Sequence, residues 1–419
     1  MTLISAILFL IVFLVLLLPI IRKEDIFSPA KIFTIIWALT LGLAELKFSR
    51  LQHEWNGYGW LMLSIGIFSF LLGCFIIYSQ NYEVKILPLS SIRNYFQNLL
   101  IDKKKYKNII LLLFLMYIVS FLGNYLIEGY LPLFHYNPGQ SRAFWGVFGI
   151  GLLIHSATAI IILITGYILI AKPPLMEKLF FMFLIIVIFV SYLTILQRFN
   201  LMFAILSSIV VVYYTSNALR PRNALIFLLL IVGLMYSVQF LRTSSLVSGY
   251  LYNLAEMKIS PKYAIITEPY MYFVMNPENF VRAVNRLETH TYGYYTFNFV
   301  LSLSGTKKII TDYVALNNFP FLNSSYNTYS ALWDYYRDFG IWGLSGIPFL
   351  LGFFISSFYY KLRSSPSLVV LMSYSIFIFI IAISFFVNTL GLLHFFFNSI
   401  LIIVAAKYID NSSLIKTSK

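Results

Sequence analysis

Charged residues are scarce in this chain of 419 residues, where they make up 11% of the sequence against 60% for hydrophobic residues. Soluble globular domains carry about 25% charged residues, so the composition excludes a soluble globular protein. Lys and Arg outnumber Asp and Glu by 30 to 16. A nucleic-acid-binding module would gather such an excess on one face of a soluble domain, and the sequence contains no such domain. We therefore expect no nucleic-acid partner.

Cysteine is nearly absent. Cys74 is the only one, so an internal disulfide is excluded, and no Cys/His spacing indicates zinc or an iron–sulfur cluster. Within its apolar run, Cys74 is expected to be a small buried side chain. A glycine-rich phosphate loop is also missing, which argues against a nucleotide-driven enzyme. No internal repeat of the kind found in many transporters is present. We expect neither a metal nor a cofactor.

Long apolar runs are what the chain has in excess. Runs of about 20 apolar residues can cross a hydrocarbon core of roughly 30 Å, where only a helix satisfies its own backbone groups. The sequence thus predicts an all-α integral membrane protein with about eleven transmembrane helices. The expected spans are 3–21, 30–46, 58–78, 108–127, 149–170, 179–196, 201–216, 224–240, 339–360, 368–388 and 391–407.

The distribution of Lys and Arg predicts the orientation. Residues 3–21 are followed by Arg22 and Lys23 and lack a small-residue cleavage site, so we interpret them as a retained helix rather than a signal peptide. Basic residues favour the cytoplasmic side, which places the N-terminus outside and, after all the spans, the C-terminus in the cytoplasm. The expected location is a bacterial inner membrane.

One long segment, 241–336, is too polar to cross the membrane and falls on the outer side in this topology. We therefore expect a transmembrane bundle of about eight spans at 1–240, an extracytoplasmic loop subdomain at 241–336, and a second bundle of about three spans at 337–419.

Two helices are expected in or near this loop. Asn276 and Pro277 suit the cap and the first position of a helix, on which Glu278, Arg282 and Arg286 would share one face at four-residue spacing. A second helix is expected from residue 327 into the span at 339–360.

Arginines at the outer ends of spans are candidate binding residues. Arg198 lies in the short link 197–200, Arg142 in a Pro/Gly-bounded loop, and Arg242 at the end of the eighth span. A guanidinium fork suits phosphate or carboxylate, so the three could converge on a diphosphate; anchoring to lipid head groups is the alternative. Within the loop, Arg282 and Arg286 could line a ligand face or form a solvated helix surface.

Residues that could exchange a proton are few. His135 and His290 could act as general bases, although surface histidines are common. Asp334 and Asp338 lie one turn apart, and either could deprotonate a sugar hydroxyl; an ion pair with Arg337 is the alternative.

The histidines inside expected spans have a structural interpretation, whereas two interpretations stay open for the tyrosines of the long loop. His155 and His394 fall inside expected spans, where a hydrogen bond between helices is their expected role. The many tyrosines of 241–336 could stack on sugar rings or mark the membrane interface.

Three passages of the sequence resemble the Wzy-type O-antigen polymerases, a family of bacterial oligosaccharide repeat-unit polymerases. The resemblance covers roughly residues 108–360. The passages are Gly129-Tyr130-Leu131-Pro132-Leu133-Phe134 followed by Arg142, Arg198 before Leu201-Met202-Phe203-Ala204, and Asn327-Thr328-Tyr329 through Tyr335-Tyr336-Arg337-Asp338-Phe339-Gly340-Ile341-Trp342-Gly343.

This resemblance implies a glycosyltransferase-C-like enzyme that polymerises undecaprenyl-diphosphate-linked repeat units at the outer face of the inner membrane, by metal-independent glycosyl transfer. Expected partners are these lipid-linked glycans, membrane lipids, a chain-length regulator and a flippase. Asp338 and His290 would be catalytic, and the substrate-binding residues would be Arg142, Arg198, Arg242, Arg282, Arg286, Arg337 and His135.

Other classes stay open. An O-antigen ligase-like glycosyltransferase would differ mainly in its acceptor. A lipid-linked oligosaccharide flippase or other transporter would need charges facing a central cavity and usually repeated halves. A structural scaffold would not need arginines at several outer helix ends.

Overall fold

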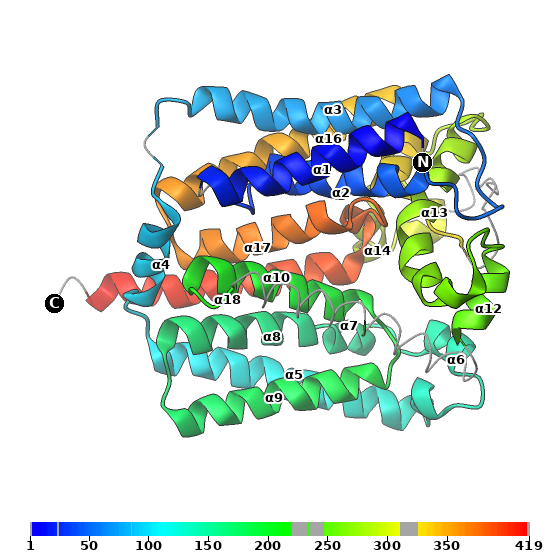
Figure 1. Ribbon diagram of the computed structural model, residues 1–419. Coiled ribbons are helices and arrows are strands. Elements are labelled where there is room, and N and C mark those ends of the chain that lie inside the picture. The colour runs from blue at the N-terminus through cyan, green and yellow to red at the C-terminus, as the bar shows by residue number, and fades with distance from the viewer. Residues whose placement is uncertain are drawn as a thin grey trace. The chain divides into compact units, whose positions relative to one another are not determined.

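The computed structural model describes residues 2–22, 25–84, 86–219, 233, 247–310 and 326–416. This described part is helical, with connecting segments and an isolated bridge between Ser49 and Met257 (Figure 1). Six of its helices are long and apolar enough to cross a membrane, so the protein is an α-helical, multi-pass membrane protein whose exposed apolar faces contact lipid. The six are Gly57–Gln80, Lys103–Phe134, Ile150–Ala171, Leu175–Leu193, Ala331–Ser364 and Leu393–Asp410.

Four shorter apolar helices coincide with other expected spans. They are Leu3–Leu18, Pro29–Ala44, Phe199–Thr215 and Leu368–Ile383. The span expected at 224–240 lies, apart from Gly233, outside the described residues. The number of about eleven spans and the orientation of the termini therefore stay predictions.

The chain forms two compact units. Unit 1 comprises Met1–Val84, Ser248–Tyr360 and Ile380–Leu393, and unit 2 comprises Lys85–Val247, Lys361–Phe379 and His394–Lys419. The domain boundaries expected at 240 and 336 stay a prediction. Residues 248–310 of the expected loop belong to the same unit as the helices at 3–80.

Unit 1 begins with α1 (Leu3–Arg22), α2 (Pro29–Ala44) and α3 (Gly57–Gln80). It continues with α12 (Val247–Leu254), η3 (Pro261–Ile266), α13 (Thr267–Val284), α14 (Asn298–Leu303), α15 (Lys307–Ile310), α16 (Ala331–Ser364) and η5 (Thr389–Gly391). Unit 2 holds α4 (Leu89–Gln97), α5 (Lys103–Glu128), η1 (Pro132–Phe134), α6 (Pro138–Phe144), α7 (Ile150–Ile154), α8 (Ala157–Gly166), η2 (Tyr167–Ala171), α9 (Leu175–Leu193) and α10 (Phe199–Thr215). The last helices are α17 (Leu368–Ile383), of which residues 368–379 belong to unit 2 and 380–383 to unit 1, and α18 (Leu393–Lys416), which belongs to unit 2 except for its first residue.

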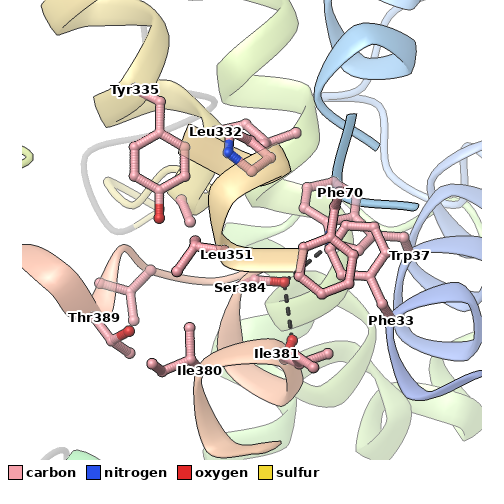
Figure 2. Close-up of a pocket in the computed structure, with 13 residues that line it drawn as sticks. Phe33, Trp37, Phe70, Leu332, Tyr335, Leu351, Ile380, Ile381, Ser384 and Thr389 are labelled. Carbon is pink, nitrogen blue, oxygen red and sulfur yellow. Dashed lines mark hydrogen bonds between the residues drawn. The ribbon is translucent and has the colours of Figure 1, made fainter. Parts of the chain in front are cut away.

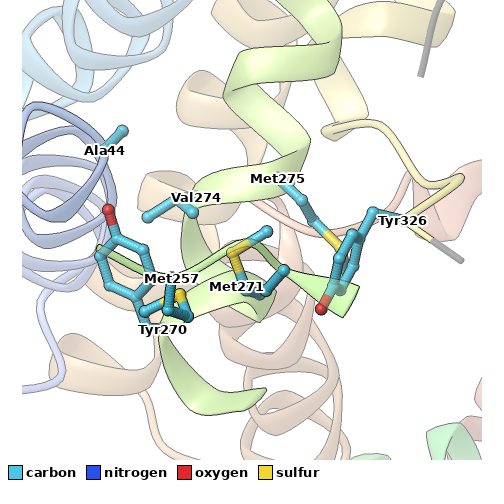
Figure 3. Packing of buried hydrophobic residues seen from close by; sticks show 8 residues of the cluster. Ala44, Met257, Tyr270, Met271, Val274, Met275 and Tyr326 are labelled. Atoms are coloured by element: carbon cyan, nitrogen blue, oxygen red, sulfur yellow. The ribbon is translucent and has the colours of Figure 1, made fainter. Parts of the chain in front are cut away.

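The expected helix start at Asn276 is wrong. Helix α13 begins at Thr267, and Pro277 lies inside it. The apolar residues before the proline explain this, because Tyr270, Met271 and Val274 are spaced for one helix face and pack into the buried cluster of Figure 3. Their burial outweighs the local start signal. The Asn276 side chain instead donates to the Tyr272 carbonyl at 2.7 Å.

The cluster in Figure 3 docks α13 against the end of α2. Its members are Ala44, Ala255, Met257, Tyr270, Met271, Val274, Met275 and Tyr326. The Tyr270 hydroxyl donates to Gln52 at 2.6 Å and accepts from the Phe48 amide at 3.0 Å, and burial raises its pKa. Residues from the expected loop are thus packed on the end of α2.

Helix α3 carries three glycines seven residues apart, Gly59, Gly66 and Gly73, on the side that packs against α13 and α16. A Cβ atom added to Gly59 would lie 2.4 Å from the Val281 side chain, and one added to Gly73 would lie 2.2 Å from the Phe349 carbonyl oxygen. Such close contact between helices is typical of small residues in membrane proteins. The expected buried position of Cys74 is confirmed, and its sulfur contacts the Gly352 carbonyl at 3.6 Å.

Helix α16 is bent. It begins at Ala331 rather than at residue 327, and at Gly340 the backbone takes φ 60° and ψ −141°, which is not helical. Beyond the bend, Gly343 allows the two arms to touch, because a Cβ atom there would lie 2.0 Å from the Tyr335 carbonyl oxygen. The segment 331–339 therefore packs against the start of the apolar segment that follows.

Candidate functional site

The bend in α16 organises the candidate site in unit 1. Asp338, just before the bend, is fully buried. Its Oδ1 accepts hydrogen bonds from the Thr291 hydroxyl and the Tyr295 amide, and its Oδ2 accepts one from the Thr296 amide at 2.6 Å. Since these donors occupy both oxygens, we interpret Asp338 as a positioning residue that holds the 291–296 turn, rather than as the base.

Backbone bonds fasten the same turn to α16. The Thr291 amide donates to the Arg337 carbonyl and the Tyr292 amide donates to the Asp338 carbonyl, both at 3.1 Å. Tyr292 takes a left-handed conformation with φ 46°, in which a bulky side chain is uncommon. The turn therefore holds a strained residue at the point where it meets α16.

Arg337 stacks on an aromatic ring of this turn. Its guanidinium carbon lies 3.9 Å from the centre of the Tyr295 ring and 6.0 Å from that of Trp333. Arg337 is only 8% exposed, and a cation over a desolvated ring gains up to about 2 kcal/mol. Burial raises the pKa of Tyr295, and the charge of Arg337 acts in the opposite direction. The stacking fixes the orientation of the guanidinium.

His290 is exposed beside the bend. Its Nδ1 lies 3.3 Å from the Arg337 carbonyl oxygen, and a carbonyl can only accept, so Nδ1 carries the proton. In the neutral ring this leaves Nε2 with a lone pair. A Cβ atom at position 340 would lie 3.0 Å from His290 Nε2, so the ring lies against Gly340. The arrangement provides a proton acceptor on the surface near Arg337.

Two tyrosines continue the rim of this site. The hydroxyls of Tyr58, at the start of α3, and Tyr336 are 2.7 Å apart, and the Tyr336 ring meets the His290 ring edge-on at 6.3 Å. Phenol hydroxyls and exposed aromatic faces suit a hydroxylated ligand such as a sugar. We call Tyr58, His290, Tyr295, Tyr336 and Arg337 the α16 site.

Glu278 and Arg282, both in α13, bind the neighbouring segment 47–55. Glu278 accepts from the His53 amide at 2.8 Å and from the Trp55 ring at 2.7 Å, and it pairs with Lys47 at 3.2 Å. Arg282 donates to the Leu51 carbonyl, and burial lowers its pKa, against the opposing effect of Glu278. Both residues therefore fasten the chain around 47–55 to α13.

Arg286 does not share the helix face expected for it. Helix α13 ends at Val284, and Arg286 follows as an exposed residue. The prediction that Arg286 shares a helix face with Glu278 and Arg282 is therefore wrong, because α13 ends before residue 286.

The remaining sequence candidates lie in unit 2 or outside the described residues. The centre of the His135 ring lies 4.8 Å from that of Tyr130 and 4.2 Å from that of Tyr136. Arg142 is in the last turn of α6, and Arg198 caps the start of α10. Arg242 lies outside the described residues. The convergence of Arg142, Arg198 and Arg242 on a diphosphate stays a prediction.

Unit 2 also contains a buried polar network. His155 Nδ1 lies 2.9 Å from the Tyr192 hydroxyl of α9 and 2.7 Å from Asn200 Nδ2 of α10. This confirms the hydrogen bond between helices expected for His155. The His394 ring lies 5.1 Å from the His155 ring.

An apolar pocket lies inside unit 1 (Figure 2). Its cavity volume is about 20 Å³, and it lies between α2, α3, α16 and the end of α17. The lining residues are Phe33, Trp37, Phe70, Ala331, Leu332, Tyr335, Pro348, Leu351, Ile380, Ile381, Ser384, Val387 and Thr389. Leu332 and Tyr335 lie on the same arm of α16 as Arg337.

Sequence reasoning identified Arg337, Asp338 and His290 but missed the residues that orient them. Tyr295, Thr291 and Thr296 gave no signal on their own, because their partner Asp338 lies more than forty positions further along the chain. A readable signal for the docking of α16 was the repeat of Gly59, Gly66 and Gly73.

Comparison with known proteins gives no family for this chain. It matches no protein-family model, no curated protein and no solved structure. Within the described residues, no group of three or more His, Cys, Asp or Glu side chains could hold a metal ion.

Proposed function

We propose that the protein is a membrane glycosyltransferase that polymerises undecaprenyl-diphosphate-linked repeat units into an O-antigen-type polysaccharide at the outer face of a bacterial inner membrane. One observation carries the proposal: Arg337, stacked on Tyr295, and the exposed base candidate His290 lie together at the bend of a helix that continues as a candidate membrane span. A substrate with a lipid tail, a diphosphate and a sugar needs those three surroundings next to one another.

Arg337 is the group that would meet the diphosphate. In glycosyl transfer, the bond between the anomeric carbon and the diphosphate oxygen breaks, and the diphosphate leaves with the electron pair. A preoriented positive charge stabilises that developing charge more than water does. The centre of the Tyr295 ring lies 3.9 Å from the guanidinium carbon, which fixes the orientation of the planar fork, and a fork of this kind suits two phosphate oxygens.

His290 is the group that would activate the acceptor. Its Nε2 accepts the proton of an acceptor sugar hydroxyl while the hydroxyl oxygen bonds to the anomeric carbon, on the side opposite the leaving diphosphate. Since Nδ1 donates to the Arg337 carbonyl at 3.3 Å, Nε2 is the free base. Asp338 supports this by holding the turn that carries Tyr295.

A glycan ladder from cells lacking the gene tests the proposal. The deletion should leave a lipid core with a single repeat, and the wild type should restore the ladder. Arg337→Ala should fail to restore it at equal membrane abundance. Arg337→Lys keeps the charge without the fork and should lower the polymerisation rate on purified lipid-linked units about 10²-fold or more. Arg50→Ala, an exposed arginine of the same unit, is the matched control and should behave as wild type.

Other outcomes of the glycan-ladder experiment would support one of the alternative functions. If single repeats are also missing from the core while lipid-linked polymer accumulates outside, a ligase replaces the polymerase. Units that accumulate inside the cell indicate a flippase. A normal ladder in the deletion strain removes polysaccharide assembly altogether.

A further inference from the structure

We infer that Tyr292 binds the acceptor: its exposed ring is the platform on which the acceptor sugar stacks beside His290. The inference rests on the proposed glycosyl transfer and adds to it the residue that holds the acceptor. Arg337 would meet the diphosphate and His290 would take the proton, but neither of them covers the face of a sugar ring.

Backbone contacts place Tyr292 next to the α16 site. Its amide donates a hydrogen bond to the Asp338 carbonyl at 3.1 Å. His290, two residues earlier, lies with its Nδ1 3.3 Å from the Arg337 carbonyl oxygen, and its ring lies against Gly340. The segment 290–292 therefore runs along the bend of α16, and the Tyr292 ring is attached directly beside the residues proposed to carry out the transfer.

The ring of Tyr292 takes no part in holding the fold together. It is 84% exposed, and within the described residues its side chain makes neither a ring contact nor a hydrogen bond. The stretch that leads to it is exposed and carries Arg286, Glu288 and His290. Charged groups of this kind lie in water, because placing them in hydrocarbon is costly. The Tyr292 ring therefore offers a bare aromatic face to water on a polar surface.

The backbone at Tyr292 is unfavourable for this type of residue. Its φ of 46° is left-handed, a conformation in which a bulky side chain is an outlier. Gly293 follows with φ 95°, and at this second left-handed position, where a Cβ atom would lie 3.0 Å from the Phe297 ring, the turn does have a glycine. A glycine at 292 would form the same turn with less strain. Strained residues of this kind cluster at ligand-binding sites, and no contact within the fold offsets the strain at Tyr292.

A sugar ring is the ligand that suits this surface. The C–H groups on one face of a pyranose can stack on the phenol ring, while the hydroxyls at the edge of the sugar stay in water or meet His290. Such stacking holds the acceptor equally in the ground state and in the transition state. It therefore lowers the substrate concentration at half-maximal rate without changing the maximal rate.

Polymerisation by the full-length protein in phospholipid vesicles, measured against the concentration of purified lipid-linked repeat units, tests the assignment. Tyr292→Leu keeps an apolar side chain without an aromatic face. It should raise the concentration at half-maximal rate about tenfold, with a maximal rate within about threefold of wild type. Tyr292→Phe keeps the ring and should stay within about threefold of wild type in both quantities. Tyr82→Leu, at a tyrosine of the same unit that is 75% exposed, is the matched control and should behave as wild type.

Tyr292→Gly separates the binding role from a structural one. Relief of the left-handed φ should raise the unfolding temperature, whereas loss of the ring should weaken half-saturation about tenfold, as in Tyr292→Leu. A wild-type protein that forms no polymer overturns the proposed function and the inference with it. If the wild type polymerises, the inference alone is overturned by unchanged half-saturation in Tyr292→Leu and Tyr292→Gly, or by a loss confined to the maximal rate.

Discussion

The crossing of α3 and α16 allows the sharpest test of the packing. Gly73 and Gly352 face each other's backbone: a Cβ atom on Gly73 would lie 2.2 Å from the Phe349 carbonyl oxygen, and one on Gly352 would lie 2.1 Å from the Phe70 carbonyl oxygen. Ordinary contact begins at 3.4 Å. The helices would therefore have to separate by 3.4 − 2.2 = 1.2 Å or 3.4 − 2.1 = 1.3 Å.

Backbone atoms cannot turn aside as a side chain can, so Gly73→Ala or Gly352→Ala must move a whole helix. Overpacking of this kind costs about 1–3 kcal/mol, and two backbones in contact place these variants at the upper end. The control is Gly346→Ala on the same helix, where an added Cβ atom meets nothing within 4 Å. Alanine favours a helix over glycine by up to about 1 kcal/mol, so the control should be at least as stable as wild type.

Thermal unfolding of the purified protein in one detergent, followed by tryptophan fluorescence, measures the difference. We expect Gly73→Ala and Gly352→Ala to unfold at clearly lower temperature than Gly346→Ala. The double variant should lose less than the sum of the singles, because one helix displacement relieves both contacts. Equal stability of the crossing variants and the control would refute the close packing of α3 on α16.

Four further substitutions test the α16 site and its supports. His290→Gln should lower transfer activity about 10²-fold or more with no change in thermal stability. Gly340→Ala should lower both transfer activity and thermal stability. A left-handed φ costs an alanine about 1–2 kcal/mol, and the new methyl group would press on His290. Asp338→Asn should destabilise the protein by about 2 kcal/mol, since hydrogen bonds to a charged acceptor are lost; activity lost at full stability would instead make Asp338 a catalytic residue. Glu278→Gln should cost about 1–3 kcal/mol in unfolding free energy, because Lys47 loses the nearer of its two carboxylates, Glu278 at 3.2 Å, and keeps only Glu45 at 3.7 Å.

The transmembrane helices could be predicted from the sequence because each apolar run carries its own evidence. A helix in hydrocarbon satisfies its backbone internally, so length and composition suffice to predict α3, α5, α9 and α18. The start of α13 could not be predicted in this way. The pattern at Asn276 and Pro277 is a good start signal, but the burial of Met271 and Val274 against α2 continues the helix through it.

The site could be predicted only in part, because its contacts join residues that lie far apart in the chain. Arg337 and Asp338 stand out because charges are rare beside a membrane span. What Asp338 does depends on Thr291, 47 residues earlier in the chain, and no local pattern links the two. The bend at Gly340 likewise has no unique signature, because glycine also occurs where the backbone stays helical, as at Gly346 of the same helix.

The packing of α3 joins the site to the membrane part of the protein. Gly59 meets Val281 of α13, Gly66 meets Leu332 on the first arm of α16, and Gly73 meets Phe349 on the second arm. One helix thus fixes both arms of the bend around Arg337, and sites on packed helices are more exact than sites on loops. Changes at these glycines should therefore reduce stability and activity together, whereas a change at His290 should reduce activity alone. That difference distinguishes residues that hold the site in place from a residue that reacts with the substrate.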